Sequence, residues 1–148
     1  LLQEEAVGAL RDLLLPMAAV VTPNIPEAET LTGLTISTDD DVRKAAKEIV
    51  SMGAASVAVK GGHREGPATD VYYDGSSFRE FTSPRFETVN THGTGCTFAS
   101  AVAAGLAKGL PNEDAVGQAK EFVTEAIPHS FPIGQGHGPL NHFYKLWK

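Results

Sequence analysis

Apolar residues recur along the first part of this chain in two spacings, which predict alternating helices and buried strands. The first spacing, with an apolar residue every three to four positions and charged residues between, predicts an amphipathic helix that ends before Pro16. Its apolar members are Leu2, Ala6, Leu10, Leu13 and Leu14. Residues 17–21 and 56–60 are short, mostly apolar runs, which are typical of strands covered on both faces of a parallel sheet. Between these runs, residues 38–50 have helical spacing and Gly53 follows as the expected C′ residue, so the order predicts a βαβ unit.

The pattern changes in the second part of the chain. Residues 70–73 and 78–82 flank an Asp-Gly turn, which predicts a β-hairpin with an architectural role. Two further helices are predicted, one from residue 98 to near Gly109 and one with a buried face over residues 115–127. The Gly- and Pro-rich residues 131–139 predict an ordered loop, and residues 142–147 are expected to pack the chain end down. The predicted fold class is α/β, with three α/β/α layers and a mostly parallel sheet.

Composition narrows the class of protein. The length of 148 residues suits one domain, and the net charge of −6 argues against nucleic acid or an anionic membrane as the main partner. The one cysteine excludes an internal disulfide, no Cys/His set has zinc spacing, and a reducing cytoplasm is the expected location. No apolar run approaches the roughly 20 residues that span a bilayer, and no signal peptide is visible. The chain opens inside a helical pattern without an initiator Met, so we expect the back part of a longer polypeptide.

The strongest candidate for chemistry is the stretch Asn-Thr-His-Gly-Thr-Gly-Cys-Thr at residues 90–97, just before the small-residue helix. A glycine-rich turn that enters a helix presents unpaired backbone N–H groups and the positive end of the helix dipole, which together suit a phosphate. Gly93, Thr94 and Gly95 would supply these groups, and Cys96 lies directly after them. The alternative is a tight turn that packs a buried helix, with Cys96 as a small core residue.

Two further candidate groups follow the predicted strands. Asn24 and Glu27 come after the first strand, and Lys60, Gly61 and Gly62 end the second, so in a doubly wound sheet all would face one crevice. An amide and a carboxylate suit Mg²⁺ held partly by water and a nucleotide phosphate, and a lysine suits phosphate oxygens. The alternatives are a turn and helix cap for Asn24 and Glu27, and a solvated strand end for Lys60. The presence of all three groups in this order favours the functional interpretation.

Four stretches resemble the hydroxymethylpyrimidine/phosphomethylpyrimidine kinases of thiamin biosynthesis, which belong to the ribokinase superfamily. They are residues 21–29 (Val-Thr-Pro-Asn-Ile-Pro-Glu-Ala-Glu), 59–63 (Val-Lys-Gly-Gly-His), 90–97 and 134–139 (Gly-Gln-Gly-His-Gly-Pro). The resemblance runs from near residue 1 to the end of the chain. It implies an ATP-dependent kinase that phosphorylates the hydroxymethyl group of 4-amino-5-hydroxymethyl-2-methylpyrimidine and then its monophosphate.

The resemblance also implies residue roles. Asn24 and Glu27 would stand for the superfamily's Asn-x-x-Glu magnesium motif, Lys60 would contact nucleotide phosphates, and residues 93–95 would form the anion hole. Most of the superfamily has Asp at the position of Cys96. The pyrimidine kinases and the cysteine-type pyridoxal kinases have Cys there, as this chain does. Cys96 would be the general base that takes the proton from the substrate hydroxyl.

In the family, a front half that this sequence does not contain supplies the start of the sheet and most of the pyrimidine pocket. The expected partners are therefore that N-terminal half and the pyrimidine alcohol, with a homodimer possible. We interpret the chain as the C-terminal part of a single ribokinase-like domain over residues 1–148. The fragment alone is expected to aggregate or to need its other half, because cut sheet edges and apolar surface would be exposed.

Three alternatives stay open from the sequence. The first is a cysteine-type pyridoxal kinase, and the second is a non-catalytic nucleotide-binding or regulatory domain. The third, a thioester- or disulfide-forming enzyme that uses Cys96, is disfavoured because no His/Asp partner arrangement is apparent. His63 and His92 are interpreted as local hydrogen-bonding residues, and no metal-ligand spacing is evident for His129, His137 or His142.

Overall fold

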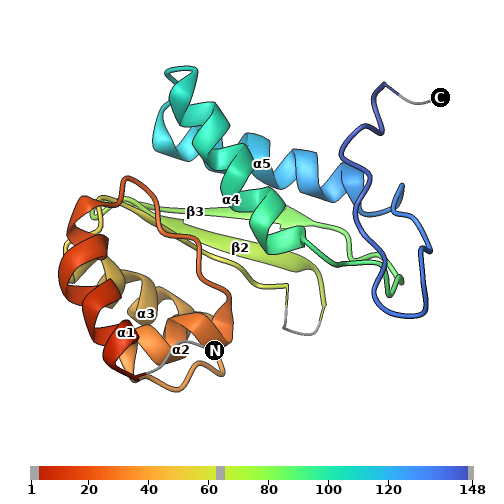
Figure 1. Ribbon diagram of the computed structural model, residues 1–148. Helices are drawn as coiled ribbons and strands as arrows, with labels where there is room; N and C mark the ends of the chain where they lie inside the picture. Colours follow the sequence, from red (N-terminus) through yellow and green to blue (C-terminus); the bar gives the residue numbers. More distant parts are fainter. Residues whose placement is uncertain (1–3, 63–65, 147–148) are drawn as a thin grey trace. The chain divides into compact units, whose positions relative to one another are not determined.

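The structure is a computed structural model that describes residues 4–62 and 66–146. The chain divides into two compact units, Leu1–Thr82 and Ser83–Lys148, which we call unit 1 and unit 2 and describe separately. Their elements are labelled in Figure 1.

Unit 1 begins with helical segments that continue beyond the predicted end. Helix α1 (Glu4–Ala9) passes into a π-helix η1 (Leu10–Leu14) and a 3-10 turn η2 (Leu15–Met17). The prediction that winding stops before Pro16 is wrong, because a proline in the first turn of the 3-10 segment needs no N–H partner. Leu13 and Leu14 are 66% and 56% exposed, since residues spaced for an α-helix leave its buried face where the winding becomes π-helical. Leu2 lies outside the described residues.

The predicted strand at residues 17–21 pairs in parallel with β1 (Val57–Val59) but forms only isolated bridges. The Val21 amide donates to Ser56 O at 3.0 Å, and the Ala58 amide donates to Val21 O at 2.8 Å. Pro23 interrupts the ladder because it has no N–H, although its carbonyl accepts from the Lys60 amide at 2.8 Å. The parallel pairing of the βαβ prediction is therefore confirmed, whereas the regular strand is not formed.

The named strands form a three-stranded sheet in the order β1-β2-β3. Strand β2 (Ala68–Tyr73) is antiparallel to β1, with Val59 opposite Val71, and turns into β3 (Phe78–Ser83). The hairpin is confirmed, and amide and hydroxyl donors of Ser77 and Ser76 hold the pKa of the Asp74 carboxyl below its usual range. The prediction of a mostly parallel sheet is wrong for the described residues, because the chain returns beside β1 through a hairpin rather than through another crossover helix.

Two helices pack with the sheet of unit 1 around one apolar core (Figure 1). Helix α3 (Asp39–Ser51) matches the predicted helix and presents Val42, Ala45, Ala46 and Ile49 to the core. Helix α2 (Ile25–Thr32) is not among the predicted helices, although a helix cap at Asn24 and Glu27 is one of the alternatives that the sequence leaves open. Pro26 is tolerated because it lies in the first helical turn, and Ala28 and Leu31 then fall on the buried face.

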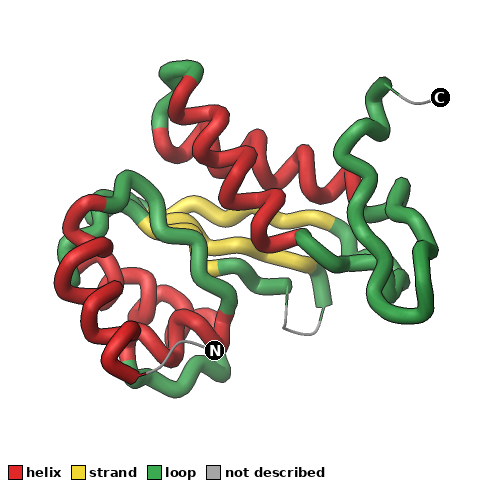
Figure 2. Tube along the Cα trace, in the orientation of Figure 1, coloured by secondary structure: helices red, strands yellow, loops and turns green. Residues whose placement is uncertain are grey.

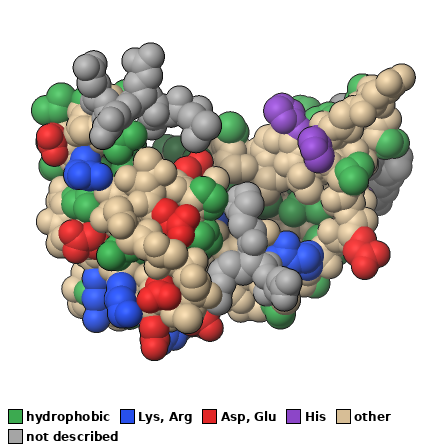
Figure 3. Space-filling view, turned by 90° about the horizontal axis from the view of Figure 1, so that it is seen from below, with side chains coloured by type: hydrophobic (Ala, Val, Ile, Leu, Met, Phe, Trp, Pro, Cys, Tyr) green, Lys and Arg blue, Asp and Glu red, His purple; other side chains and the backbone are tan. Residues whose placement is uncertain are grey.

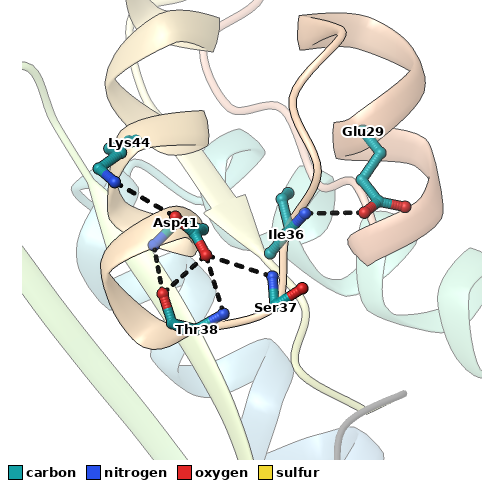
Figure 4. Close-up of polar contacts among 6 residues, drawn as sticks. All are labelled: Glu29, Ile36, Ser37, Thr38, Asp41 and Lys44. Atoms are coloured by element: carbon teal, nitrogen blue, oxygen red, sulfur yellow. Dashed lines mark hydrogen bonds and ion pairs between the residues drawn. The ribbon is translucent and has the colours of Figure 1, made fainter.

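The start of α3 is fixed by a reciprocal capping box, drawn in Figure 4. The Asp41 amide donates to Thr38 Oγ1 at 3.2 Å, and the Thr38 amide donates to Asp41 Oδ2 at 3.0 Å. Thr38 Oγ1 also donates to Asp41 Oδ2 at 2.7 Å, and Lys44 lies 3.2 Å from Asp41 Oδ1. These donors, the Thr38 hydroxyl first among them, lower the pKa of Asp41 to about 2.

This cap predicts a measurable acid dependence of stability. Because the folded-state pKa of Asp41 is depressed, its contribution is present above about pH 4 and is lost as the pH falls towards 2. We expect Asp41→Asn to be less stable than the parent at pH 6, with the difference closing between pH 4 and pH 2 in thermal melts. Asp40→Asn is the matched control, since it removes a charge from the same turn without a Thr38 contact. A constant difference across this range would contradict the prediction.

Unit 2 contains two helices that pack against each other, α4 (Thr94–Ala107) and α5 (Asn112–Ala126). Both match the predicted helices, and a side-chain carbon at Gly105 would lie 3.0 Å from the Ala115 Cβ, so the small residue permits the close approach. After α5 the described chain is loop, as predicted for residues 131–139 (Figure 2).

The chain end packs down only in part. The Tyr144 ring stacks on His129 with centroids 5.4 Å apart and also contacts Phe122. Phe143 and Leu146 remain 50% and 76% exposed, and Trp147 lies outside the described residues. No helix of the described residues is both long and apolar enough to cross a membrane.

Candidate functional site

In unit 1 the two candidate strand-end groups lie side by side. Asn24 and Lys60 form a parallel bridge, three residues along both segments from the Val21–Val57 bridge. Because bridged strands lie about 5 Å apart, the amide-carboxylate group and the lysine turn share one end of the sheet. The sequence predicted this proximity from the strand ends alone.

Asn24 and Glu27 form a capping box at the start of α2. Asn24 Oδ1 accepts from the Glu27 amide at 2.8 Å, and Glu27 Oε2 accepts from the Asn24 amide at 2.7 Å. The helix-cap interpretation is therefore realised, and the cap fixes the positions of both side chains at the start of α2. The signal in the sequence that could have identified α2 is the same Asn-x-x-Glu spacing, followed by apolar residues at 28 and 31.

An open cleft of about 550 Å³ lies beside this cap. Its wall is mostly apolar, with polar groups from Thr22, Asn24, Glu27 and Thr30. The apolar part comes from Val7, Leu10, Val21, Pro23, Pro26 and Leu31. Asn24 and Glu27 are thus accessible from a concave surface rather than enclosed in the core.

The turn at Lys60 is held by a residue that sequence reasoning missed. The Gly61 amide donates to Asp70 Oδ1 at 2.9 Å, and the Asp70 side chain, only 4% exposed, comes from β2. A Cβ at Gly61 would collide with the Thr69 carbonyl oxygen, so this position requires glycine. Gly61 therefore shapes the turn, while nothing lies within 4 Å of a Cβ at Gly62. The available signal was an acidic residue inside a predicted strand, where a charge needs a partner.

In unit 2 the glycine turn has the local geometry predicted for an anion site. Gly93 is the N-cap of α4 with φ +85°, a left-handed conformation that favours glycine. The Thr94 amide and hydroxyl both donate to Thr91 O, at 3.3 and 2.7 Å. The amides of Gly95 and Cys96 fall in the first helical turn, where an α-helix offers no carbonyl acceptor. Cys96 is exposed, which excludes the interpretation of a buried core cysteine.

The loop after α5 contacts the residues that lead into this turn. The His92 amide donates to Gly138 O at 3.2 Å, and the Gly138 amide donates to Asn90 Oδ1 at 3.0 Å. His137 Nδ1 lies 2.7 Å from Val89 O.

The described histidines are all in unit 2 and exposed, and histidine side chains are visible on its surface in Figure 3. His142 Nε2 lies 2.8 Å from Thr97 Oγ1, and His129 Nδ1 lies 2.8 Å from Glu125 O. No group of three or more His, Cys, Asp or Glu side chains suited to a metal occurs among residues 4–62 and 66–146. His63 lies outside these ranges.

Comparison with known proteins gives a consistent result. The phosphomethylpyrimidine kinase family matches residues 1–141. A hydroxymethylpyrimidine/phosphomethylpyrimidine kinase of Bacillus subtilis (strain 168) is 51% identical over 145 residues, which cover 97% of this chain and 54% of that protein. The chain thus spans about half the length of the curated relatives it matches.

Solved structures of similar folds include two pyridoxal kinases. The Bacillus subtilis enzyme, in an ADP complex, has a TM-score of 0.92 at 44% identity, and the match covers 97% of this chain and 57% of that one. The Staphylococcus aureus enzyme, in complex with AMP-PCP, has a TM-score of 0.94 at 38% identity and corresponding coverages of 99% and 55%. The fold is therefore that of part of a ribokinase-like kinase.

Proposed function

Because the chain belongs to the phosphomethylpyrimidine kinase family, we propose that it is the C-terminal part of a single kinase domain with a three-layer α/β/α fold. The complete domain phosphorylates the hydroxymethyl group of 4-amino-5-hydroxymethyl-2-methylpyrimidine and then its monophosphate, using ATP. Supporting this, the family matches residues 1–141, and the separate alignment with the Bacillus relative covers 97% of this chain but only 54% of that protein. The remaining part of the domain would complete the sheet and the pyrimidine pocket.

The observation that carries the proposal is the glycine turn with its exposed cysteine. The left-handed Gly93 starts α4 so that the Gly95 and Cys96 amides point out of its first turn, and the thiol lies on the same turn. Amides in this position stabilise the charge that grows on a phosphoryl group during transfer. In the proposed step Cys96, as the thiolate, takes the proton of the attacking hydroxyl, whose oxygen bonds to the γ-phosphorus of ATP while the bond from that phosphorus to the bridging oxygen breaks and ADP leaves.

The residues of unit 1 fit the nucleotide and its metal. Lys60 is bridged to Asn24 at the strand end, and its ammonium group would hold phosphate oxygens there. Glu27 is exposed at the cleft, and one carboxylate with an amide suits Mg²⁺ that keeps several waters and binds chiefly through phosphates. Bound Mg²⁺ supplies charge neutralisation for the phosphates. In contrast to the assignment from the sequence, Gly61 is given a supporting role, because its amide is bound to Asp70.

Pyridoxal is the second candidate substrate. The similar solved structures at TM-scores of 0.92 and 0.94 are pyridoxal kinases, and one was solved with ADP and one with AMP-PCP. A pyridoxal kinase would use the same glycine turn and thiol, so the two candidates differ in the acceptor alcohol rather than in the phosphoryl-transfer residues.

A chimeric chain tests the proposal. Residues 1–148 replace the matched part of the Bacillus hydroxymethylpyrimidine kinase, and ADP release is measured with the pyrimidine alcohol, its monophosphate, pyridoxal or no alcohol. We expect release that depends on the pyrimidine substrates. Release with pyridoxal alone would support the second candidate. ATP binding without release with any alcohol would instead support a non-catalytic nucleotide-binding domain.

A further inference from the structure

The Gly-Gln-Gly-His-Gly-Pro motif at residues 134–139 has no role in the proposed chemistry, yet its second half contacts the glycine turn directly. We call residues 137–142 the brace. Figure 2 shows the loop after α5 running beside the segment that leads into α4, and His92 and Pro139 form a parallel bridge there. Two irregular segments about 45 residues apart in sequence are thus paired at the base of the proposed anion site.

Gly138 is the closest point of this pairing. Its carbonyl accepts from the His92 amide and its amide donates to Asn90 Oδ1, so it is bonded on both sides. A Cβ at Gly138 would lie 2.6 Å from Asn90 Oδ1 and would collide with the Phe131 carbonyl oxygen. The lack of space for a Cβ therefore requires glycine at position 138, whereas its backbone does not, because its φ is not left-handed. At Gly136, two residues earlier, a Cβ would meet nothing within 4 Å.

The brace holds the turn at both ends. At the entry, Asn90 binds Gly138, and His137 Nδ1 lies 2.7 Å from Val89 O. At the exit, His142 Nε2 lies 2.8 Å from the hydroxyl of Thr97, which is buried and follows Cys96 directly. The segment between these ends, residues 91–96, contains Gly93, Gly95 and the thiol.

We propose that the brace sets the conformation of the glycine turn, and that Asn90, Gly138 and His142 are positioning residues for the Gly95 and Cys96 amides and the Cys96 thiol. The inference rests on the proposed function for its kinetic consequence but not for its structural one. A displaced turn misdirects amides that act on the transferring phosphoryl group, while nucleotide affinity from Lys60 in unit 1 is retained.

The structural consequence is tested by hydrogen exchange in the chimera, comparing Gly138→Ala with Gly136→Ala. We expect the hydrogen-bonded amides of His92, Thr94 and Thr97 to exchange at least about tenfold faster in Gly138→Ala, with α5 amides unchanged in both variants. Equal exchange of the His92, Thr94 and Thr97 amides in the two variants would overturn the proposal. An equal increase in the exchange rate of the α5 amides would also overturn the proposal, because it would indicate global destabilisation. This result does not depend on kinase activity.

The kinetic consequence is tested with variants that add no atoms to the brace. We expect Asn90→Ala and His142→Ala to lower kcat at least about tenfold with the KM for ATP changed less than about threefold. His142→Gln, whose side-chain amide can still bond the Thr97 hydroxyl, should restore most of kcat. A lower melting temperature with kcat unchanged would overturn the positioning role. A parent chimera inactive with every alcohol would refute the proposed function and leave the exchange result to decide the brace.

Discussion

Cys96→Ala is expected to lower kcat for phosphorylation of the pyrimidine alcohol about 10²–10⁴-fold, the usual contribution of a positioned base. ATP binding should change little, because in the proposed site the nucleotide is held by Lys60 and by backbone amides that the substitution keeps. Residual activity should remain, since a loose phosphoryl-transfer transition state depends mainly on charge stabilisation. The thiol is exposed on the first turn of α4, so alanine leaves no cavity in the core.

Steady-state kinetics of the chimera and titration with Mg²⁺-ATP measure the two effects separately. Ser100→Ala is the matched control, because Ser100 is exposed on the same helix one turn later. The control should keep parental kcat. Turnover near that of the parent in Cys96→Ala would refute the assignment of the base, and loss of ATP binding would show that the side chain contributes to the nucleotide site instead.

Gly61→Ala is expected to produce the largest loss of stability. The added methyl would collide with the Thr69 carbonyl of β2, a backbone atom that cannot rotate away. Relief of the collision requires the Lys60 turn to separate from β2, which breaks the buried hydrogen bond from the Gly61 amide to Asp70. Overpacking typically costs about 1–3 kcal/mol, and removing the acceptor of the buried Gly61 amide about 1–3 kcal/mol. We therefore expect a loss of roughly 2–5 kcal/mol in the free energy of unfolding.

Urea denaturation of Gly61→Ala and Gly62→Ala, both made in the chimera, gives the comparison. The two glycines are adjacent, but a Cβ at Gly62 would meet nothing within 4 Å, so this control should lose less than about 1 kcal/mol. Equal stability of the two variants would show that the turn can move away from β2 at no cost, and Gly61 would then have no structural requirement for glycine.

The sequence was sufficient wherever a local rule decides the conformation. The hairpin follows from the Asp-Gly turn between β-forming runs, and α3 follows from its capping residues, its apolar period and Gly53, whose φ of +111° ends it. The left-handed Gly93 and the helix that follows it also depend on neighbouring residues alone. For the same reason the motif at residues 90–97 could be read as an anion site before any geometry was known.

The tertiary structure decided what depends on residues far apart in the chain. The predicted strand at residues 17–21 keeps only the Val21 bridge, and beyond it Pro23, which has no N–H, separates that bridge from the Asn24–Lys60 bridge. Gly61 and Gly138 are required by carbonyl oxygens of Thr69 and Phe131, which no local pattern identifies. Asp70 and His142 became part of the candidate site through contacts 9 and 45 residues away in sequence. Short stretches of sequence contain the residues of the candidate site, whereas the contacts that hold these residues in place arise from packing between distant segments.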